Sequence, residues 1–249
     1  MQRIFHNLQV DHNKNEAVRT YELLQAFGWT KNERYQQQDI SEFNCVLRDA
    51  LESQMENTEV KGTYKNLFEG KSQNVIKCIN IDYESTSDEK WSFLQLNVKG
   101  NNTIEDSFKQ YIAPEKLEKD NQYETAAHGK QDAIKFIRLL ELPPVLQISL
   151  NRYEYDFTTH IMTKINQKFQ FQEILDLEPI LPKNEKPSSS INRYHLHSIL
   201  VHSGTMNQGH YFAYIKPNLD DRWFKFNDNK VTEVTKYHAL GQGAGGNIT

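Results

Sequence analysis

The chain has 249 residues, of which 37% are hydrophobic and 11% aromatic, and its formal net charge is −4. This length and aromatic content are typical of a folded protein with a buried core, and they exclude a largely disordered chain. The acidic balance and the lack of a Lys/Arg-rich run argue against nucleic acid as the main partner and fit a partner that offers positive charge. No stretch approaches the roughly 18 apolar residues of a membrane span, so no membrane partner is predicted.

Cysteine usage indicates the compartment. Cys45 and Cys78 are the two cysteines, which is too few for a disulfide framework in a chain of this length. Residues 1–10 mix polar and apolar types and lack the apolar centre of a signal peptide. We therefore expect a reducing environment, the cytoplasm or the nucleus.

The first part of the sequence predicts two helices. Residues 16–27 carry apolar side chains near helical spacing, and Gly28 follows as a plausible C-terminal stop. Residues 39–56 place apolar side chains on one face of a 3.6-residue repeat, while Asp39, Glu42 and Asp49 lie towards the other face.

Strands dominate the rest of the chain. Two are expected at residues 74–83 and 91–98, around a polar turn at 85–90, and a short helix at 103–111 is predicted to begin with Thr103 as its N-cap. Because helices come first and strands last, the predicted fold class is α+β with a largely antiparallel sheet. The remaining predicted segments are strands at 133–139, 145–153, 194–202, 210–216 and 223–227, a polar loop at 184–190, and a flexible Gly-rich tail at 241–249.

A histidine near the C-terminal end carries the clearest chemical pattern. His210 begins an aromatic-rich strand after a Gly-containing turn, and Asn227 and Asp228 end the next predicted strand. Neighbouring antiparallel strands can bring such positions side by side. A histidine beside an amide or carboxylate acceptor is the base and its orienting group in nucleophilic catalysis. The alternative is a structural histidine in a strand turn.

Residues 201–204, 209–214 and 223–228 together resemble the histidine box of ubiquitin-specific proteases, papain-like cysteine proteases that cut after the last glycine of ubiquitin. Within that family the sequence resembles the herpesvirus-associated group. The resemblance runs from about Phe27 to Ala239 and includes residues 38–42, 67–70, 142–146 and 150–153. It implies the family's fold, with a helical thumb, an antiparallel palm sheet and β fingers, over a partial catalytic domain at residues 1–240.

The resemblance also implies roles for individual residues. His210 matches the general base, Asn227 the residue that orients it, and Asp228 the adjacent acidic position. Asp39 and Glu42 match acidic positions that meet the arginine-bearing tail of ubiquitin, and carboxylates pair well with guanidinium groups; the alternative for both is a solvated helix face. Four further positions match residues that line the tail channel or its mouth, although ordinary strand packing would also explain them: Arg152, Tyr153, His202 and Tyr211.

The family's nucleophile has no counterpart in this sequence. In the family, a cysteine lies in a Gly-x-Thr-Cys-Tyr box ahead of all the matching segments. Residues 1–10 contain no cysteine and resemble the helix after that box, so we expect the chain to begin behind it, with a truncated thumb. Cys45 lies inside a predicted helix without a neighbouring His, Lys or helix N-terminus to lower its pKa, so a catalytic role is not expected. Cys78 is interpreted as a structural thiol in a strand.

No metal or other cofactor is predicted. Many family members bind zinc in the finger region through two Cys-x-x-Cys pairs. Here Cys78 supplies one cysteine and residues 123–130 supply only His128, whereas tetrahedral zinc needs four such ligands.

Three functions remain open. The first is a thiol-dependent deubiquitinase acting on ubiquitin and ubiquitinated proteins, of which this chain is the part behind the nucleophile box. The second is an inactive pseudo-protease that binds ubiquitin, and the third is an adaptor with the same fold and no ubiquitin affinity. Without the box, apolar surface on the helices near Tyr21, Leu24 and Phe43 is expected to be exposed, which predicts marginal stability.

Overall fold

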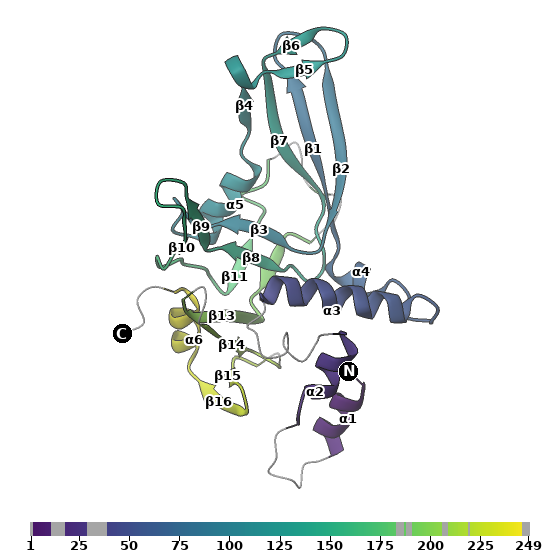
Figure 1. Cartoon of the computed structure of the whole chain (residues 1–249), viewed down its shortest axis with the longest axis vertical. Coiled ribbons are helices and arrows are strands. Elements are labelled where there is room, and N and C mark those ends of the chain that lie inside the picture. Colours follow the sequence, from purple (N-terminus) through teal and green to yellow (C-terminus); the bar gives the residue numbers. More distant parts are fainter. Residues whose placement is uncertain are drawn as a thin grey trace. The chain divides into compact units, whose positions relative to one another are not determined.

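The computed structural model describes residues 2–10, 18–28, 39–182, 187, 191–205, 209–218 and 220–245. It divides into two compact units, one comprising Met1–Tyr64 with Leu200–Thr235 and the other Lys65–Ile199 with Lys236–Thr249. Figure 1 labels the elements of both units. Within the described ranges, no helix is both long and apolar enough to cross a membrane.

The first unit begins with three helices, α1 (Gln2–Val10), α2 (Tyr21–Ala26) and α3 (Ile40–Met55). The helix predicted at residues 16–27 is shorter than expected, because residues 18–20 are not helical and residues 16–17 lie outside the described ranges. Helix α3 begins where predicted, since the Oδ1 atom of Asp39 accepts hydrogen bonds from the backbone N–H groups of residues 41 and 42, at 2.8 and 3.2 Å.

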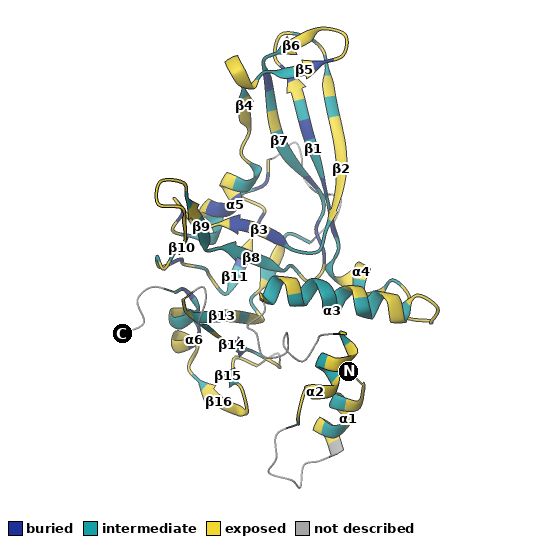
Figure 2. Cartoon of the chain, in the orientation of Figure 1, coloured by how far each residue is buried: buried dark blue, intermediate teal, exposed yellow. Residues whose placement is uncertain are grey.

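These helices bury little of their apolar surface. Neither α2 nor α3 contains a fully buried residue, as the teal and yellow ribbons of Figure 2 show. The side chain of Tyr21 is 49% exposed, whereas Leu24 and Phe43 are half-buried. The predicted exposure is therefore confirmed for Tyr21 and only partial for the other two residues. Phe43 gains cover from Phe27, whose ring meets it edge to face at a centroid distance of 5.5 Å.

The rest of the first unit is a four-stranded sheet in the order β13-β14-β15-β16. Its strands are β13 (Ser198–Gly204), β14 (Gly209–Ile215), β15 (Trp223–Asn227) and β16 (Lys230–Val234). Tyr214 and Trp223 are fully buried and anchor the two central strands. The two predicted strands that carry the histidine pattern are confirmed, and β14 and β15 pair antiparallel. The strand predicted at 194–202 is interrupted, with β12 (Arg193–His195) ending before β13 begins.

A long antiparallel sheet, β2-β1-β7-β4, forms one part of the second unit. It contains β1 (Gly70–Cys78), β2 (Glu84–Trp91), β4 (Glu115–Leu117) and β7 (Ala133–Glu141). The turn predicted at residues 85–90 is wrong, because these residues belong to β2 and the chain reverses before Glu84. Strand β2 lies at the sheet edge and is mostly exposed (Figure 2), so its sequence is polar and charged rather than alternating.

Short elements complete the second unit. Strands β3 (Leu94–Asn97) and β8 (Ile148–Asn151) pair in parallel, and helix α5 (Ile104–Ile112) begins at the predicted cap Thr103. The strand predicted at 145–153 breaks at Arg152 into β8 and β9. The remaining elements are α4 (Thr63–Phe68), the 3₁₀ turn Lys119–Asn121, β5 (Tyr123–Thr125), β6 (Gly129–Gln131), β9 (Tyr153–Asp156), β10 (Ile161–Lys164), β11 (Ile174–Asp176) and α6 (Lys236–Gly243).

The core of the second unit gathers around α5 and the β3–β8 pair. The hydroxyl of Tyr194 donates a 2.8 Å hydrogen bond to the carbonyl oxygen of Pro143, and burial raises the pKa of Tyr194 to about 12. This contact ties the Leu-Pro-Pro turn to the core, which gives that sequence motif a structural role. The buried core side chains are Leu94, Leu96, Phe108, Leu139, Leu142, Leu175, Leu177 and Leu181.

Two predicted irregular segments fall mainly outside the described ranges. The loop at 184–190 is described only at Pro187, and residues 246–249 are not described. Helix α6 continues to Gly243, so the first residues of the predicted tail are helical.

Gly70 has a packing role that predicts a stability effect. It lies opposite Trp91 on β1 and β2, and a Cβ atom at Gly70 would lie 2.3 Å from Cζ2 of that indole. Gly70→Ala is therefore expected to lower the free energy of unfolding by about 2 kcal/mol in urea titrations. Gly241→Ala is the matched control, because Gly241 has open space around it and alanine favours its helix. Equal stability of the two variants would contradict the packing argument.

Candidate active site

The register of β14 and β15 brings His210 and Asn227 together. Ala213 pairs with Phe226, and extending this antiparallel register by one residue places Asn227 opposite Phe212. Alternate residues of a strand share a face, so His210 lies on the same face as Phe212, diagonally across from Asn227. Accordingly, the Nε2 atom of His210 lies 2.5 Å from the Oδ1 atom of Asn227.

This contact fixes which ring nitrogen can act as a base. With the amide oxygen of Asn227 as acceptor, Nε2 of His210 carries the hydrogen and donates it. The lone pair then lies on Nδ1, which makes no hydrogen bond within the described part of the chain. The side chain of His210 is 45% exposed. The imidazole is thus oriented by one nitrogen and available for proton transfer at the other.

Asp228 lies beside this pair without forming a hydrogen bond to it. Its Oδ2 atom is 3.8 Å from Nε2 of His210, and its side chain is 75% exposed, so solvent screens its charge. Its backbone has a φ angle of +51°, in the two-residue turn between Asn227 and Lys230. Asp tolerates this left-handed conformation better than most residues. The turn itself therefore explains an Asp at this position.

Tyr211 directly follows His210 on β14, and its ring packs against that of His202. Their rings lie 4.7 Å apart between centroids, with His202 near the end of β13 and Tyr211 on β14. Gly209 makes this packing possible, because a Cβ atom there would lie 1.9 Å from Nε2 of His202. The hydroxyl of Ser203 also donates to the carbonyl oxygen of His210, at 3.3 Å. Sequence reasoning named no role for Gly209 or Ser203, although the Gly directly before His210 could have indicated a close approach.

Asp39 is the N-cap of α3 and Glu42 lies in its first turn, in the first unit. Both side chains are exposed, and that of Asp39 caps the helix. Arg152 and Tyr153 belong to the second unit. Arg152 is half-buried and donates hydrogen bonds to three backbone carbonyls, while Tyr153 begins β9. Gln38, the first residue of the matching segment 38–42, lies outside the described ranges.

Comparison with known proteins identifies the family. Residues 1–244 match the family described as "Ubiquitin carboxyl-terminal hydrolase". The chain belongs to this family. The match, together with the helices and mainly antiparallel sheets, confirms the predicted α+β, papain-like fold class.

Several curated hydrolases of this family are similar over nearly the whole chain. Ubiquitin carboxyl-terminal hydrolase 15 of Schizosaccharomyces pombe is 44% identical over 246 residues, covering 99% of this chain and 21% of that protein. Ubiquitin C-terminal hydrolase 12 of Arabidopsis thaliana is 43% identical, covering 99% and 22%. Ubiquitin carboxyl-terminal hydrolase 7 of Drosophila melanogaster is 42% identical, covering 99% and 21%. The chain therefore spans about a fifth of the length of these hydrolases.

Neither cysteine of this family member lies at the N-terminus of a helix. Cys45 lies in the interior of α3 and is half-buried, and Cys78 is the buried last residue of β1. Both are free thiols. A nucleophile usually lies at a helix N-terminus or next to a histidine, and neither residue lies at such a helix end.

The finger region does not provide a zinc site from its described residues. Nearby polar side chains are paired with one another, since the amide of Gln122 donates to Asp132 at 2.8 Å. Thr125 and Gln131 bond to backbone atoms in the turn that contains His128. Across the described ranges, no group of three or more His, Cys, Asp or Glu side chains is arranged to hold a metal ion. Cys78 and His128 alone do not fit tetrahedral zinc.

Proposed function

We propose that this chain is the base-bearing part of a ubiquitin-specific protease, a deubiquitinase that hydrolyses the bond after the C-terminal glycine of ubiquitin. The observation that supports this proposal best is the 2.5 Å contact between Nε2 of His210 and Oδ1 of Asn227, in a member of the ubiquitin carboxyl-terminal hydrolase family. Within that family we assign the chain to the herpesvirus-associated group, on the basis of its sequence resemblance.

The proposed chemistry is acyl transfer to a thiol that is neither Cys45 nor Cys78. We assign this thiol to a cysteine box that is not among the 249 residues. Nδ1 of His210 takes the thiol proton, and the thiolate attacks the glycine carbonyl carbon to form a tetrahedral intermediate. The intermediate collapses as His210 protonates the departing amine, and water activated by His210 then hydrolyses the thioester. Asn227 holds the tautomer, and the exposed Asp228 lies beside the pair, 3.8 Å from Nε2 of His210.

Ubiquitin and ubiquitinated proteins are the proposed partners. Asp39 and Glu42 offer two exposed carboxylates at the start of α3, one at its N-cap and one in its first turn, which suits the arginine-bearing tail of ubiquitin. Tyr153, His202 and Tyr211 offer aromatic rings for the tail channel. The half-buried or exposed state of these side chains leaves surface for contact with a ligand.

Removing the two carboxylate charges should weaken ubiquitin binding. Alanine substitutions would also remove the cap of α3, so Asp39→Asn with Glu42→Gln is the better pair, because Asn caps a helix as well as Asp does. We expect the dissociation constant for ubiquitin, measured by calorimetry, to rise about tenfold or more. The control is Asp82→Asn with Glu59→Gln, which changes charge equally at exposed positions elsewhere. Unchanged affinity in the folded Asp39/Glu42 variant would exclude this contact.

A ubiquitin-binding pseudo-protease is the second candidate. It is favoured by the placement of Cys45 inside α3 and of Cys78 at the end of β1, because neither thiol lies at a helix N-terminus. This candidate predicts ubiquitin affinity without turnover, even when a cysteine box precedes the chain.

A further inference from the structure

The positively charged side chain of Arg152 is hydrogen-bonded to backbone carbonyl oxygens instead of being paired with an acidic side chain. Its Nη1 atom donates to the carbonyl oxygens of Ile165 and Gln167, at 3.1 and 2.9 Å, and its Nη2 atom donates to that of Ala244 at 3.1 Å. The guanidinium is half-buried, and desolvation lowers the pKa of Arg152. No acidic side chain pairs with it in the described part of the chain.

These hydrogen bonds join three separate segments of the second unit. Arg152 lies at the break between β8 and β9, Ile165 and Gln167 follow β10, and Ala244 follows α6. The carbonyl oxygen of Arg152 also accepts a 2.7 Å hydrogen bond from the backbone N–H of Ile165. Both the side chain and the main chain of Arg152 therefore hold the base of the β9–β10 hairpin.

The contact at the end of α6 is close and buried. The carbonyl oxygen of Ala244 also accepts from the backbone N–H of Phe169 at 2.8 Å, and both residues are buried. A Cβ atom on Gly245, whose φ angle is +75°, would lie 3.0 Å from Nη2 of Arg152. A positive charge at this position also suits the negative end of the helix dipole. Three of the five N–H groups of the guanidinium are thus used within the protein.

We infer that Arg152 is a positioning residue that fixes the β9–β10 hairpin against the end of α6, and so aims Tyr153, rather than a residue that contacts ubiquitin. The part of this inference that concerns Tyr153 rests on the proposed function. Tyr153 directly follows Arg152, so movement at the base of the hairpin moves its ring. A Lys at position 152 would keep the charge but could not donate to three carbonyls in the same planar geometry.

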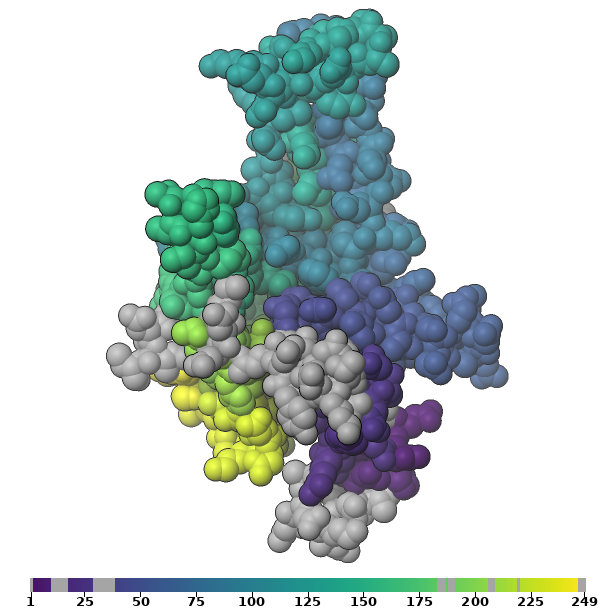
Figure 3. Space-filling model, in the orientation of Figure 1, coloured from purple at the N-terminus to yellow at the C-terminus, as the bar shows by residue number. Residues whose placement is uncertain are grey.

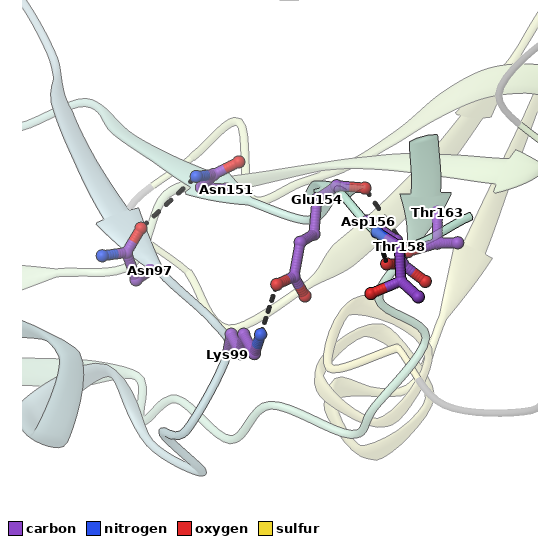
Figure 4. Close-up of polar contacts among 7 residues, drawn as sticks. All are labelled: Asn97, Lys99, Asn151, Glu154, Asp156, Thr158 and Thr163. Carbon is purple, nitrogen blue, oxygen red and sulfur yellow. Dashed lines mark hydrogen bonds and ion pairs between the residues drawn. The ribbon is translucent and has the colours of Figure 1, made fainter. Parts of the chain in front are cut away.

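The hairpin has a second anchor, which supplies a control. Lys99 forms an ion pair with Glu154, and Asn151 donates to Asn97 at 3.3 Å, as Figure 4 shows. The hairpin lies at the surface of the second unit, in green in Figure 3, and the side chain of Lys99 is 70% exposed. An exposed ion pair contributes little to stability. Lys99→Ala therefore removes the ion pair with Glu154, a hairpin contact that contributes little to stability.

Hydrogen exchange in the free protein tests, without ubiquitin, whether the hydrogen bonds of Arg152 hold the base of the β9–β10 hairpin. Arg152→Ala and Arg152→Lys should each speed exchange of the amides of Ile165 and Phe169 by about tenfold or more, because local opening becomes easier. The amide of Val75, in the distant strand β1, serves as the reference for global unfolding and should change less. Lys99→Ala should leave all three amides unchanged. Wild-type protection of Ile165 and Phe169 in Arg152→Ala would overturn the inference.

Ubiquitin affinity then separates positioning from contact. Affinity is measured at 15 °C in variants that circular dichroism shows to be folded. Arg152→Lys should weaken ubiquitin binding by about tenfold in the wild-type background. In a Tyr153→Ala background the same substitution should weaken it by less than about twofold. Equal losses in both backgrounds would mean that the guanidinium contacts ubiquitin directly, and full affinity in Arg152→Lys would mean that its three hydrogen bonds do not position Tyr153. If the wild-type chain itself fails to bind ubiquitin, the proposed function fails. The exchange experiment still decides whether Arg152 holds the β9–β10 hairpin against the end of α6.

Discussion

His210→Ala is expected to lower kcat by about 10⁴-fold in a fusion that places a segment carrying the family's Gly-x-Thr-Cys-Tyr box before Met1. Such a segment can be taken from any member of the family that carries the box. Without His210, nothing accepts the thiol proton or returns it to the departing amine. KM for a ubiquitin C-terminal amide with a fluorescent leaving group should change little, because the imidazole acts on the reacting atoms rather than on ubiquitin binding.

Asn227 variants refine this test. Asn227→Ala removes the 2.5 Å contact that holds Nε2 of His210, so kcat should fall by about 10²-fold. Asn227→Asp keeps an acceptor at the same place, so activity should be kept. A fully active Asn227→Ala fusion would contradict the orienting role.

His128→Ala serves as the matched histidine control, since His128 lies in the turn between β5 and β6, in the second unit. It should leave both kcat and KM unchanged. A fusion that binds ubiquitin but shows no turnover would instead favour the pseudo-protease. Substantial activity in the His210→Ala fusion would reject His210 as the base.

The candidate active site was predictable where it depends on neighbouring strands. Strand β14 carries His210, strand β15 ends with Asn227, and Asp228 lies in the turn that follows. Because β14 and β15 are antiparallel neighbours, few registers are possible for these side chains. The sequence could not predict the backbone requirement at Asp228, because a φ angle of +51° is a property of the turn geometry. Nor could it show that the carboxylate of Asp39 accepts a hydrogen bond at the start of α3. For that reason the proposed ubiquitin contact is tested with Asn, which keeps the cap, rather than with Ala.

The misses share a physical cause, which is that local patterns do not reveal long-range partners. Strand β2 has an exposed, charged sequence that is typical of a turn, and only its pairing with β1 makes it a strand. The parallel pair β3–β8 and the bonds from Arg152 to Ala244 join residues far apart in the sequence. The resemblance placed Arg152 among ligand-contacting residues, whereas its hydrogen bonds are made to the protein's own main chain.

Gly209→Ala is expected to lower kcat/KM of the same fusion by about 10²-fold while leaving the overall secondary structure intact. The new methyl group would lie 1.9 Å from Nε2 of His202 and 2.8 Å from the carbonyl oxygen of Ser203. Real Cβ atoms do not approach other atoms this closely, so β14 must shift away from β13. Because His210 is the next residue, the shift moves its imidazole relative to Asn227, and errors of about 1 Å are costly in proton transfer.

A second variant shows which of the two clashes controls the site. His202→Ala together with Gly209→Ala removes the imidazole clash and leaves the carbonyl clash, so activity should recover only in part relative to His202→Ala alone. Gly241→Ala, which has open space around it, should have no effect on activity. Full activity in Gly209→Ala would mean that the close contact between β13 and β14 does not position His210. Partial recovery would show that Gly209 keeps His210 in position by avoiding two clashes, one with the carbonyl oxygen of Ser203 and one with the imidazole of His202.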